Sequence, residues 1–425
     1  KNIMNILVLG NGAREHALCY SIAKSPRLTK LFCAPGNYGI RKVAEVHNFD
    51  INNFDILYDF CSEKEIDLVV VGPEVPLVNG VVDFLESKNV KAFGPKKVPA
   101  NLEGSKIFMK DICSQYSIPT AAYNKFTEKK SAETYLLNQS LPVVIKASGL
   151  AAGKGVTIVT TMDEGLHAIN DIFNNKFGSG CELVIEEFMD GEEASYFVFT
   201  DGTNYIPLSS AQDHKRIGDG DTGPNTGGMG AYSPAPVFTQ EIQDQVNKEM
   251  IEPTLKAMRD LGTPYQGILY AGVMIKNNYA KLVEYNVRFG DPECQVLVLR
   301  LQSDIVELLL GTIEGNINDI NTSWANNHAA TVVMASNGYP GEYKKGTIIN
   351  NLDTIQLHEN IKIFHAGTEF KDDNVLAVGG RVLSVSGSGN DLKSALENIY
   401  NTINEIDWAE STFRKDIGWR AVDNG

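Results

Sequence analysis

The chain has 425 residues, of which 43% are hydrophobic and 21% are charged. This composition is typical of a globular protein, and the length exceeds what one ordinary core holds, so we expect two to four domains. The net charge of −15 disfavours nonspecific nucleic-acid binding, although local basic groups can still hold small anions. No apolar run approaches the ~18 residues of a membrane span.

The six cysteines are scattered along the chain without a C-x-x-C pair. Neither a disulfide framework nor a zinc site is expected, and a reducing cytoplasm fits this pattern. The first residues, Lys1-Asn-Ile-Met4, lack the basic, apolar and small-residue order of a signal peptide. We expect Met4 to be the natural start, with residues 1–3 an upstream remnant.

The first hundred residues alternate between predicted strands and helices, which predicts a doubly wound parallel sheet. The strands are expected from Asn5, over Leu31–Ala34, over Leu68–Val71 and over Val90–Phe93. Turns after successive parallel strands lie along one sheet edge, where ligands bind. Candidate substrate contacts in these turns are Gly10, Asn11, Gly12, Arg14, Asn37 and Glu74. Tight turns without a binding role give the same pattern.

The first turn, Gly10-Asn-Gly-Ala-Arg-Glu15, is close to the dinucleotide-binding fingerprint G-x-G-x-x-G. Glu15 replaces the third glycine, and the second strand ends in Pro35-Gly36 rather than in an acid for a ribose. A dinucleotide-dependent oxidoreductase is therefore disfavoured. The turn can still bind a phosphate or ribose at a helix N-terminus.

The stretch Leu141–Val159 predicts two strands joined by a glycine-rich loop. It differs from a Walker loop, which has four residues between its first Gly and Gly-Lys and is followed by a helix. Glycines let backbone N–H groups approach a phosphate, and lysines neutralise its charge. The pattern fits either a flap over a triphosphate or an ordinary hairpin. The residues concerned are Lys146, Gly149, Gly153, Lys154 and Gly155.

Residues 212–230 contain six glycines among several charged side chains, which disfavours a helix or a long strand. A passive linker does not need mixed charges such as Asp213 and Lys215, so a substrate loop that orders on binding is favoured.

The stretch Lys281–Glu293 begins with strict alternation, which places Glu284, Asn286 and Arg288 on one face of a strand. A carboxylate and an amide oxygen side by side suit Mg²⁺. A neighbouring guanidinium can hold a carboxylate or a transferring phosphoryl group. A half-exposed amphipathic strand is the alternative.

Other elements are predicted from local patterns. Helices are expected over Ser105–Tyr116, over Glu241–Leu261 with an interruption at Pro253, over Asp304–Leu310 and over Asp391–Ile406, and strands over Tyr265–Ile275 and Ala280–Asn286. The region from Ala329 is β-rich.

Two side chains of this β-rich region, His365 and Arg381, are candidate contacts for a ribose phosphate, although a structural role is at least as fitting for His365. We assign no role from the sequence to the basic segment Arg414–Arg420.

Six motifs carry a resemblance to a known family. They are Asn101-Leu-Glu-Gly-Ser-Lys106, Lys146-Ala-Ser-Gly-Leu-Ala-Ala-Gly-Lys-Gly155, Glu186-Glu-Phe-Met-Asp-Gly-Glu-Glu-Ala-Ser195, Gln212-Asp-His-Lys215, Asp221-Thr-Gly-Pro-Asn-Thr-Gly-Gly-Met-Gly-Ala-Tyr-Ser-Pro234 and Arg288-Phe-Gly-Asp-Pro-Glu293. In this order they resemble the ATP-grasp superfamily and, within it, the phosphoribosylamine–glycine ligase family. The resemblance runs from about Asn5 to Ala421. Ser148 stands where the family usually has Asp, which weakens any role for that side chain but not for the loop's backbone.

The resemblance implies an ATP site. Leu183–Phe188 would be the strand under the adenine, where Glu186 accepts from the exocyclic amine, and Glu193 would meet the ribose hydroxyls. For Glu192 the resemblance implies no role beyond surface charge. The full set of implied ATP contacts is Lys106, Lys146, Gly153, Lys154, Gly155, Glu186, Glu187, Phe188 and Glu193.

The resemblance also implies the substrate and metal contacts. Mg²⁺, with Mn²⁺ as a substitute, would sit on Glu284 and Asn286, and Arg288 would orient a glycine carboxylate and support phosphoryl transfer. Asp213 and Lys215 would act beside it. The remaining substrate contacts would be Gly290, Asp291, Pro292, Glu293 and Arg381, together with the turn residues of the N-terminal third.

From these observations we expect a multi-domain α/β protein. An N-terminal Rossmann-like substrate domain is predicted over residues 1–104. An ATP-grasp domain follows over 105–328, with a small α/β lid at about 121–193, and a β-rich C-terminal domain over 329–425. We expect a free-standing, monomeric chain.

The implied reaction is the ATP-dependent ligation of glycine to 5-phosphoribosylamine, a step of purine biosynthesis that passes through glycyl phosphate. No nucleic-acid or membrane partner is expected. Two alternatives stay open: another ATP-grasp ligase, such as a carboxylating purine or biotin-type enzyme, and an inactive nucleotide-binding regulator. Intact Lys146, Glu284, Asn286 and Arg288 argue against the regulator.

Overall fold

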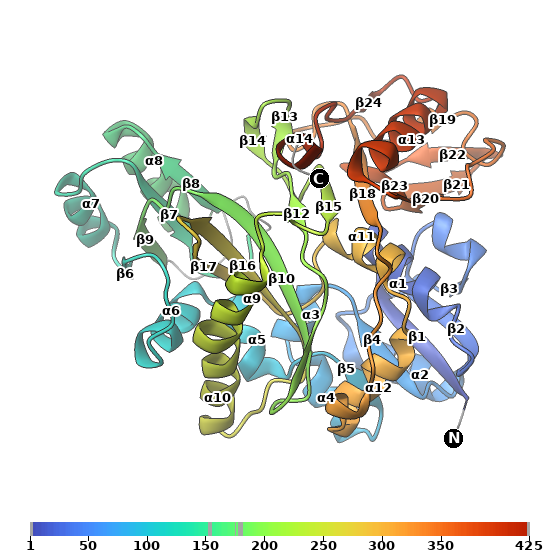
Figure 1. Cartoon of the computed structure of the whole chain (residues 1–425), viewed down its shortest axis with the longest axis horizontal. Helices are drawn as coiled ribbons and strands as arrows, with labels where there is room; N and C mark the ends of the chain where they lie inside the picture. The colour runs from blue at the N-terminus through green and yellow to red at the C-terminus, as the bar shows by residue number, and fades with distance from the viewer. Residues whose placement is uncertain (1–2, 152–154, 175, 177–181, 423–425) are drawn as a thin grey trace.

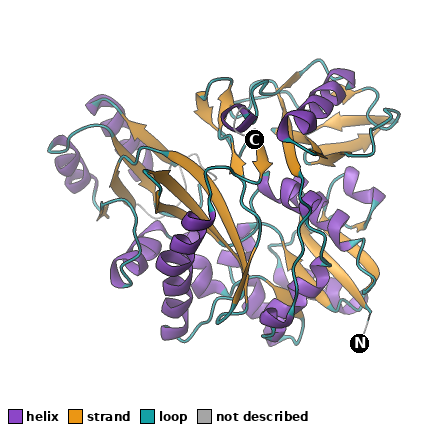
Figure 2. Ribbon diagram, in the orientation of Figure 1, coloured by secondary structure: helices purple, strands orange, loops and turns teal. Residues whose placement is uncertain are grey.

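A computed structural model describes residues 3–151, 155–174, 176 and 182–422 of the chain. Figures 1 and 2 show a parallel sheet near the N-terminus, a long antiparallel sheet at the centre, a small sheet with two helices at one side, and a strand-rich C-terminal part. The mixed α/β architecture is the predicted one. No helix among the described residues is long and apolar enough to cross a membrane.

The N-terminal sheet is entirely parallel, with the order β3-β2-β1-β4-β5. Its strands are β1 (Met4–Gly10), β2 (Leu28–Pro35), β3 (Glu45–Val46), β4 (Leu68–Val71) and β5 (Lys91–Phe93). The helices between and after them are α1 (Ala13–Ile22), α2 (Phe54–Glu63), α3 (Glu74–Val78), α4 (Val81–Ser87) and α5 (Lys97–Gly104), with a short 3₁₀ turn at Gly39–Lys42. The predicted strands are confirmed; the two-residue strand β3 was not predicted.

The small sheet has the order β6-β9-β7-β8 and is antiparallel throughout. Its strands are β6 (Tyr123–Phe126), β7 (Val143–Ala147), β8 (Val156–Val159) and β9 (Leu183–Glu187), and the helices α7 (Lys129–Leu137) and α8 (Met162–Phe173) pack on it. Strands β7 and β8 flank the glycine-rich loop, as predicted.

The central sheet has the order β11-β10-β16-β17. Its strands are β10 (Glu192–Thr200), β11 (Tyr205–Pro207), β16 (Gly267–Lys276) and β17 (Tyr279–Asn286). The helices of this part are α6 (Lys106–Gln115), α9 (Gln240–Val246), α10 (Glu252–Asp260), α11 (Glu293–Arg300) and α12 (Ile305–Glu314).

Two local predictions for these helices are confirmed. The helix expected from Ser105 is α6, and the Ser105 hydroxyl caps it by accepting from the Phe108 N–H. The helix expected over Glu241–Leu261 is interrupted by a π-helical turn, Asn247–Ile251, just before Pro253, whose ring nitrogen has no proton to donate.

The C-terminal part is built on the path β12-β15-β18-β23-β20, with β24 also on β18, and a second sheet β19-β22-β21. The strands are β12 (Gln212–Asp213), β15 (Gly230–Ser233), β18 (His328–Ser336), β19 (Thr347–Ile349), β20 (Ile361–His365), β21 (Thr368–Lys371), β22 (Asn374–Ala377), β23 (Arg381–Gly389) and β24 (Ser411–Thr412). The helices are α13 (Leu392–Glu405) and α14 (Trp419–Val422), and a 3₁₀ turn covers Ile317–Asp319.

The glycine-rich stretch 212–230 forms short strands. It contains β12 and a separate hairpin of β13 (Arg216–Gly218) and β14 (Thr222–Asn225), and it leads into β15. Because β15 pairs with both β12 and β18, this stretch extends the C-terminal sheet. It therefore joins the central part of the chain to the C-terminal part.

Strand alternation in β1 distributes the core. Leu7 and Leu9 face a cluster shared with the central sheet, whereas Ile6 and Val8 face a cluster shared with α11, α12 and β20. All four side chains are fully buried, which holds the N-terminal sheet against both neighbouring parts.

Replacing Leu309 by Ala tests this packing. Leu309 lies on α12 and is fully buried in the second cluster, so we expect a loss of about 2–5 kcal/mol in stability and a lower melting temperature. The matched control is Leu261→Ala, because Leu261 is 54% exposed. Equal melting temperatures for the two variants in circular dichroism would contradict this account of the core.

Candidate active site

The predicted metal face lies at the end of β17. Arg288 Nη2 donates to Asn286 Oδ1 at 3.2 Å, so these two side chains lie together. Burial raises the pKa of Glu284, but Lys215, Lys106, Lys146 and Arg288 lower it more, and the pKa lies below its ordinary value. An ionised carboxylate near an amide oxygen fits a hard cation that takes its other ligands from phosphates. Among the described residues no group of three or more His, Cys, Asp or Glu side chains is arranged to hold a metal ion.

Arg288 is held by carboxylates from two distant segments. Its Nε lies 3.3 Å from Glu74 Oε2, and its Nη2 lies 3.4 Å from Glu103 Oε2. Glu103 also accepts from the Val287 N–H at 2.9 Å. Glu74, a predicted substrate contact, thus touches the guanidinium in this structure. Glu103 was not predicted as a site residue, although it belongs to the motif at residues 101–106.

Glu186 lies between two buried lysines. Its Oε2 is 3.0 Å from Lys146 Nζ, and its Oε1 is 3.1 Å from Lys110 Nζ. Burial lowers the pKa of Lys110, partly offset by Glu186. Lys110 was not predicted as a site residue from the sequence. The signal that could have indicated it is its position next to Met109, which lies on the apolar face of α6. Two lysines on one carboxylate leave a net positive charge beside the flap.

The flap approaches α6 through Lys106, whose Nζ donates to the Gly149 carbonyl at 3.4 Å. Burial lowers the pKa of this ammonium group. A Cβ on Gly155 would lie 2.8 Å from Ala151 Cβ, so the turn is too tight for a side chain there. The predicted contacts Gly153 and Lys154 lie outside the described residues.

The strand predicted to lie under the adenine is β9, which pairs with β6 and β7. The Glu187 N–H donates to the Ala122 carbonyl at 2.9 Å, and its carboxylate accepts from the Ala122 N–H at 3.1 Å. Phe188 follows β9 and is 41% exposed. An exposed ring at the end of this strand is suited to pack against a flat base.

Asp213, Lys215, Glu193 and Glu293 form a second charged group. Lys215 Nζ lies 2.9 Å from Glu193 Oε2, which raises the lysine's pKa despite burial. Burial raises the pKa of Asp213, and burial together with Asp213 raises the pKa of Glu293 to about 8. Each carboxyl group therefore affects the titration of the other.

The turn before Glu293 has no room for a side chain at its glycine. A Cβ on Gly290 would lie 1.8 Å from Glu293 Oε2. Pro292 precedes the first residue of α11, which is Glu293. The Glu293 carboxylate thus lies against Gly290, and four predicted site residues, Gly290 to Glu293, form one structural unit.

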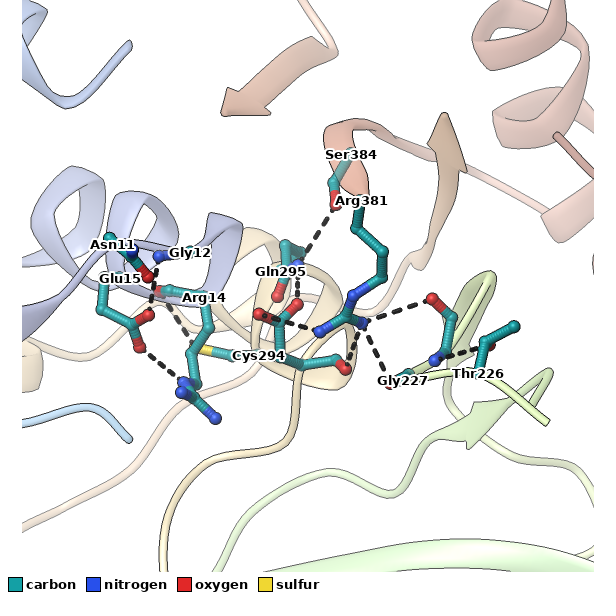
Figure 3. A network of polar contacts seen from close by, with 12 residues as sticks. Asn11, Gly12, Arg14, Glu15, Thr226, Gly227, Cys294, Gln295, Arg381 and Ser384 are labelled. Atoms are coloured by element: carbon teal, nitrogen blue, oxygen red, sulfur yellow. Dashed lines mark hydrogen bonds and ion pairs between the residues drawn. The ribbon is translucent and has the colours of Figure 1, made fainter. Parts of the chain in front are cut away.

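A cavity of about 470 Å³ lies between the first glycine turn and the C-terminal part. Figure 3 shows its polar network, with Arg14 on α1 on one side and Arg381 on β23 on the other. The predicted substrate contacts that line this cavity are Asn11, Gly12, Arg14, Asn37, Asp291 and Arg381. The fold thus brings these six predicted residues to one cavity.

Arg381 joins the two sides of this cavity. Its Nη1 donates to the carbonyls of Gly227 at 2.9 Å and Asp291 at 2.8 Å (Figure 3). Burial raises the pKa of Asp291, but Arg381 and Arg14 lower it more. Gln295, which was not predicted, donates to Asp291 Oδ1 at 2.8 Å. Asp291 is therefore fixed from three directions.

The first turn is occupied by Glu15. Glu15 accepts from the Gly12 N–H at 2.9 Å and pairs with Arg14, and a Cβ on Gly10 would lie 2.4 Å from Glu15 Cγ. This carboxylate fills the space where the third glycine of a dinucleotide fingerprint lets a pyrophosphate approach. The turn geometry thus agrees with the rejection of a dinucleotide site.

Asn37 and His365 connect the turn to β20. Asn37 Nδ2 donates to the carbonyls of Asn11 at 2.9 Å and His365 at 2.6 Å. His365 is buried, and its Nδ1 lies 2.9 Å from the Thr368 hydroxyl. Burial lowers the pKa of His365 to about 4, so the ring is neutral and its contacts are those of a structural histidine.

Three family models match the chain in order. They describe the N domain of phosphoribosylglycinamide synthetase over residues 4–103, its ATP-grasp (A) domain over 104–294 and its C domain over 329–420. Together they cover most of the chain.

Curated relatives match over nearly their whole length. A phosphoribosylamine–glycine ligase of Mesorhizobium japonicum is 52% identical over 420 residues, which cover 99% of both chains. One from Brucella melitensis biotype 1 is 49% identical over 421 residues, with the same coverage. A chloroplastic one from Arabidopsis thaliana is 50% identical over 418 residues, 96% of this chain and 79% of that protein.

Solved structures agree in fold. The phosphoribosylamine–glycine ligase of Thermotoga maritima superposes with a TM-score of 0.84 at 31% identity, covering 97% of this chain and 99% of that one. The biotin carboxylase of Campylobacter jejuni gives a TM-score of 0.74 at 16% identity, covering 97% and 93%. The second likeness shows a shared fold only.

The Asp213–Glu293 pair predicts a pH dependence of stability. A folded-state pKa of about 8 lies above that of an unfolded glutamate, so Glu293 contributes stability that is complete below the unfolded value and is lost as pH rises through about 8. Glu293→Gln does not titrate. We therefore expect its melting temperature, relative to the unmodified protein, to rise between about pH 5.5 and pH 8.5.

Thermal melts across this pH range provide the measurement. Glu241→Gln is the matched control, since Glu241 is exposed at the start of α9 and accepts from Asn278. A difference for Glu293→Gln that stays constant with pH would contradict a raised pKa of Glu293.

Proposed function

Because the chain belongs to the phosphoribosylglycinamide synthetase family, we propose that its buried charged site joins glycine to 5-phosphoribosylamine with consumption of ATP. The chain is accordingly a ligase of purine biosynthesis. The reaction is ATP + glycine + 5-phosphoribosylamine → N1-(5-phospho-D-ribosyl)glycinamide + ADP + phosphate. The observation that carries the proposal is the group of four cations around Glu284, because a site of this charge matches a triphosphate and a carboxylate substrate.

The chemistry requires activation of glycine, since a carboxylate is a poor electrophile. A glycine carboxylate oxygen bonds to the γ-phosphorus of ATP, the bond to the β-phosphate oxygen breaks, and ADP leaves. The amine nitrogen of phosphoribosylamine then bonds to the carbonyl carbon of glycyl phosphate, and phosphate leaves. The proton released by the amine passes to the carboxyl groups of Asp213 and Glu293, which lie beside Lys215.

The nucleotide would lie between the small sheet and the central sheet. Lys146 and Lys106 supply positive charge for the phosphates beside the flap, to which we also assign Gly153, Lys154 and Gly155. Glu186, Glu187 and Phe188 would contact the adenine, and Glu193 the ribose. In support, Phe188 offers an exposed ring at the end of β9.

A divalent cation fits Glu284 and Asn286, since Glu284 is kept ionised by surrounding cations and Asn286 supplies a neutral oxygen. Bound there, it would neutralise phosphate charge during transfer. We propose Mg²⁺ for this position, with Mn²⁺ as a substitute.

Arg288 would hold the glycine carboxylate, and Lys215 would lie beside the acyl group. The cavity lined by Asn11, Arg14 and Arg381 has the size for the phosphoribosyl group. It also borders Asp291, two residues before Glu293, so an amine bound there would lie near the proposed proton acceptor.

Several finer proposals accompany this function. We propose that the chain acts as a monomer. Cys19, Cys33, Cys61, Cys113 and Cys294 are free and buried, which supports a cytoplasmic location, although the Arabidopsis relative carries a chloroplastic label. We also propose the division into residues 1–104, 105–328 with a lid at 121–193, and 329–425.

The reaction is tested by ADP release with Mg²⁺ and ATP, adding glycine and freshly made phosphoribosylamine singly and together. We expect release only when both are present. Release that depends on bicarbonate instead of glycine would assign the chain to the carboxylating enzymes of this fold. No release under any combination, with ATP still bound, would favour the inactive regulator.

The residue roles are tested by Glu284→Ala and Arg288→Ala. Each removes a group that acts on transferring charge, so we expect kcat to fall on the order of 100-fold or more. The control is Lys276→Ala on the neighbouring strand β16, where an exposed ion pair with Asp190 is lost and kcat stays unchanged. Unchanged kcat in both site variants would refute these roles.

A further inference from the structure

The basic segment near the C-terminus packs against the hairpin that follows Asp213 and Lys215. We call residues 414–420 the C-terminal latch. Figure 1 shows α14, which begins in the latch, beside β13 and β14. The two segments are some two hundred residues apart in sequence, so their contact is a product of the fold alone.

Arg414 is the centre of the contact. Its side chain is fully buried, and its Nη1 lies 2.9 Å from Asp221 Oδ1 while its Nε and Nη2 bond both oxygens of Asp416 at 2.8 Å. Arg420 Nη2 reaches the second oxygen of Asp221 at 3.0 Å. A buried guanidinium with two-point contacts fixes its partners in geometry as well as in charge.

Backbone groups complete the contact on both sides. Gly220 N–H donates to Asp416 Oδ2 at 2.9 Å, and Lys415 N–H donates to Asp219 Oδ1 at 2.8 Å. The latch is itself held on α13, because Tyr400 donates its hydroxyl proton to the Arg414 carbonyl at 2.7 Å. The hairpin turn therefore rests on a fixed support.

A second contact reaches the residue between Asp213 and Lys215. Gly418 N–H donates to His214 Nε2 at 3.0 Å. Asp213 and Lys215 face the acidic group with Glu193 and Glu293, while His214 is buried against the latch. This is the alternation of an extended segment, in which neighbouring side chains point to opposite faces. The latch thus contacts the face of the segment that carries His214, and the opposite face carries Asp213 and Lys215, the two proposed reacting groups.

The stretch needs such a support. With six glycines over residues 212–230, it loses much conformational entropy when it orders, and few large side chains pack it. We propose that the C-terminal latch is a positioning element for the ligase reaction, in which Arg414 through Asp221 and Gly418 through His214 hold Asp213 and Lys215 in place. This inference rests on the roles proposed above for Asp213 and Lys215.

The test uses Asp221→Asn in the full chain, because this change keeps the shape of a half-buried side chain and removes the charge that two arginines share. A displaced catalytic segment costs on the order of 10- to 100-fold in rate, so we expect kcat to fall in that range. The dissociation constant of ADP, measured by calorimetry, rises by a smaller factor than kcat falls, since Lys106, Lys146 and Glu186 are untouched and the displaced segment reaches the nucleotide site through Glu193. A general loss of folded structure would weaken ADP binding and lower kcat by similar factors.

Three further variants sharpen the result. Lys415→Gln removes an exposed positive charge from the same segment. Lys415 takes part in the contact through its backbone N–H, which glutamine keeps, so kcat stays at the unmodified value. Arg414→Gln lowers kcat, and combining it with Asp221→Asn adds little, because both remove one interaction. Lys215→Ala reports whether the supported residue matters at all.

The outcomes separate the two levels of the proposal. Unmodified kcat in Asp221→Asn together with low kcat in Lys215→Ala overturns the latch and leaves the proposed function standing. Unmodified kcat in both Asp221→Asn and Lys215→Ala overturns the latch and the proposed role of that lysine together. Equal losses of ADP binding and kcat in Asp221→Asn would show a structural contact only and likewise overturn the positioning role.

Discussion

Charge balance in a buried volume is the constraint on which the site depends. Lys106, Lys146, Lys215 and Arg288 all lower the pKa of Glu284, and Lys110 lies just behind them on Glu186. Burying several like charges costs free energy unless each has a close partner, because one distant charge does not offset the loss of hydration. Each cation here has a carboxylate or carbonyl within reach. A triphosphate that enters such a site meets donors already fixed in place, so little reorganisation remains for the moment of reaction.

That balance can exist only in the folded chain, because its members come from distant segments. Arg288 meets Glu74 from the N-terminal sheet edge and Glu103 from the end of α5, and Lys215, which follows β12, meets Glu193 on β10. Arg381 brings the C-terminal part onto the Asp291 turn. The hydrophobic clusters on the two faces of β1 hold these parts together. Packing and charge therefore support each other. The hydrophobic clusters bring the charged side chains together, and a buried charge without a partner would oppose the packing of its part of the chain against the others.

The sequence predicted those features that depend on local chemistry. Alternation in Lys281–Asn286 placed Glu284 and Asn286 on one face, and β-branched runs predicted the strands around the flap. Residues that act through a distant partner were missed. In the sequence, Lys110 looks like any other helix lysine, because its partner Glu186 lies on the distant strand β9. Glu103 could not be predicted as a site residue because its partner Arg288 is also distant in sequence. The basic segment Arg414–Arg420 had no readable role, because its partners, Asp221 and His214, lie in a glycine-rich stretch with no periodic pattern to place it.

The C-terminal part contributes contacts to the site itself and does not merely lie next to it. Strands β12 and β15 extend its sheet with residues from the centre of the chain, Arg381 reaches the Asp291 turn, and the latch supports the segment of Asp213 and Lys215. A glycine-rich segment suits close approach to small substrates, since it has few side chains in the way, yet the same property leaves it without packing of its own. Contacts on the face opposite to Asp213 and Lys215 meet both needs. The face with these two side chains stays open for substrates, while the buried Arg414 and the Gly418 N–H hold the segment from the other face.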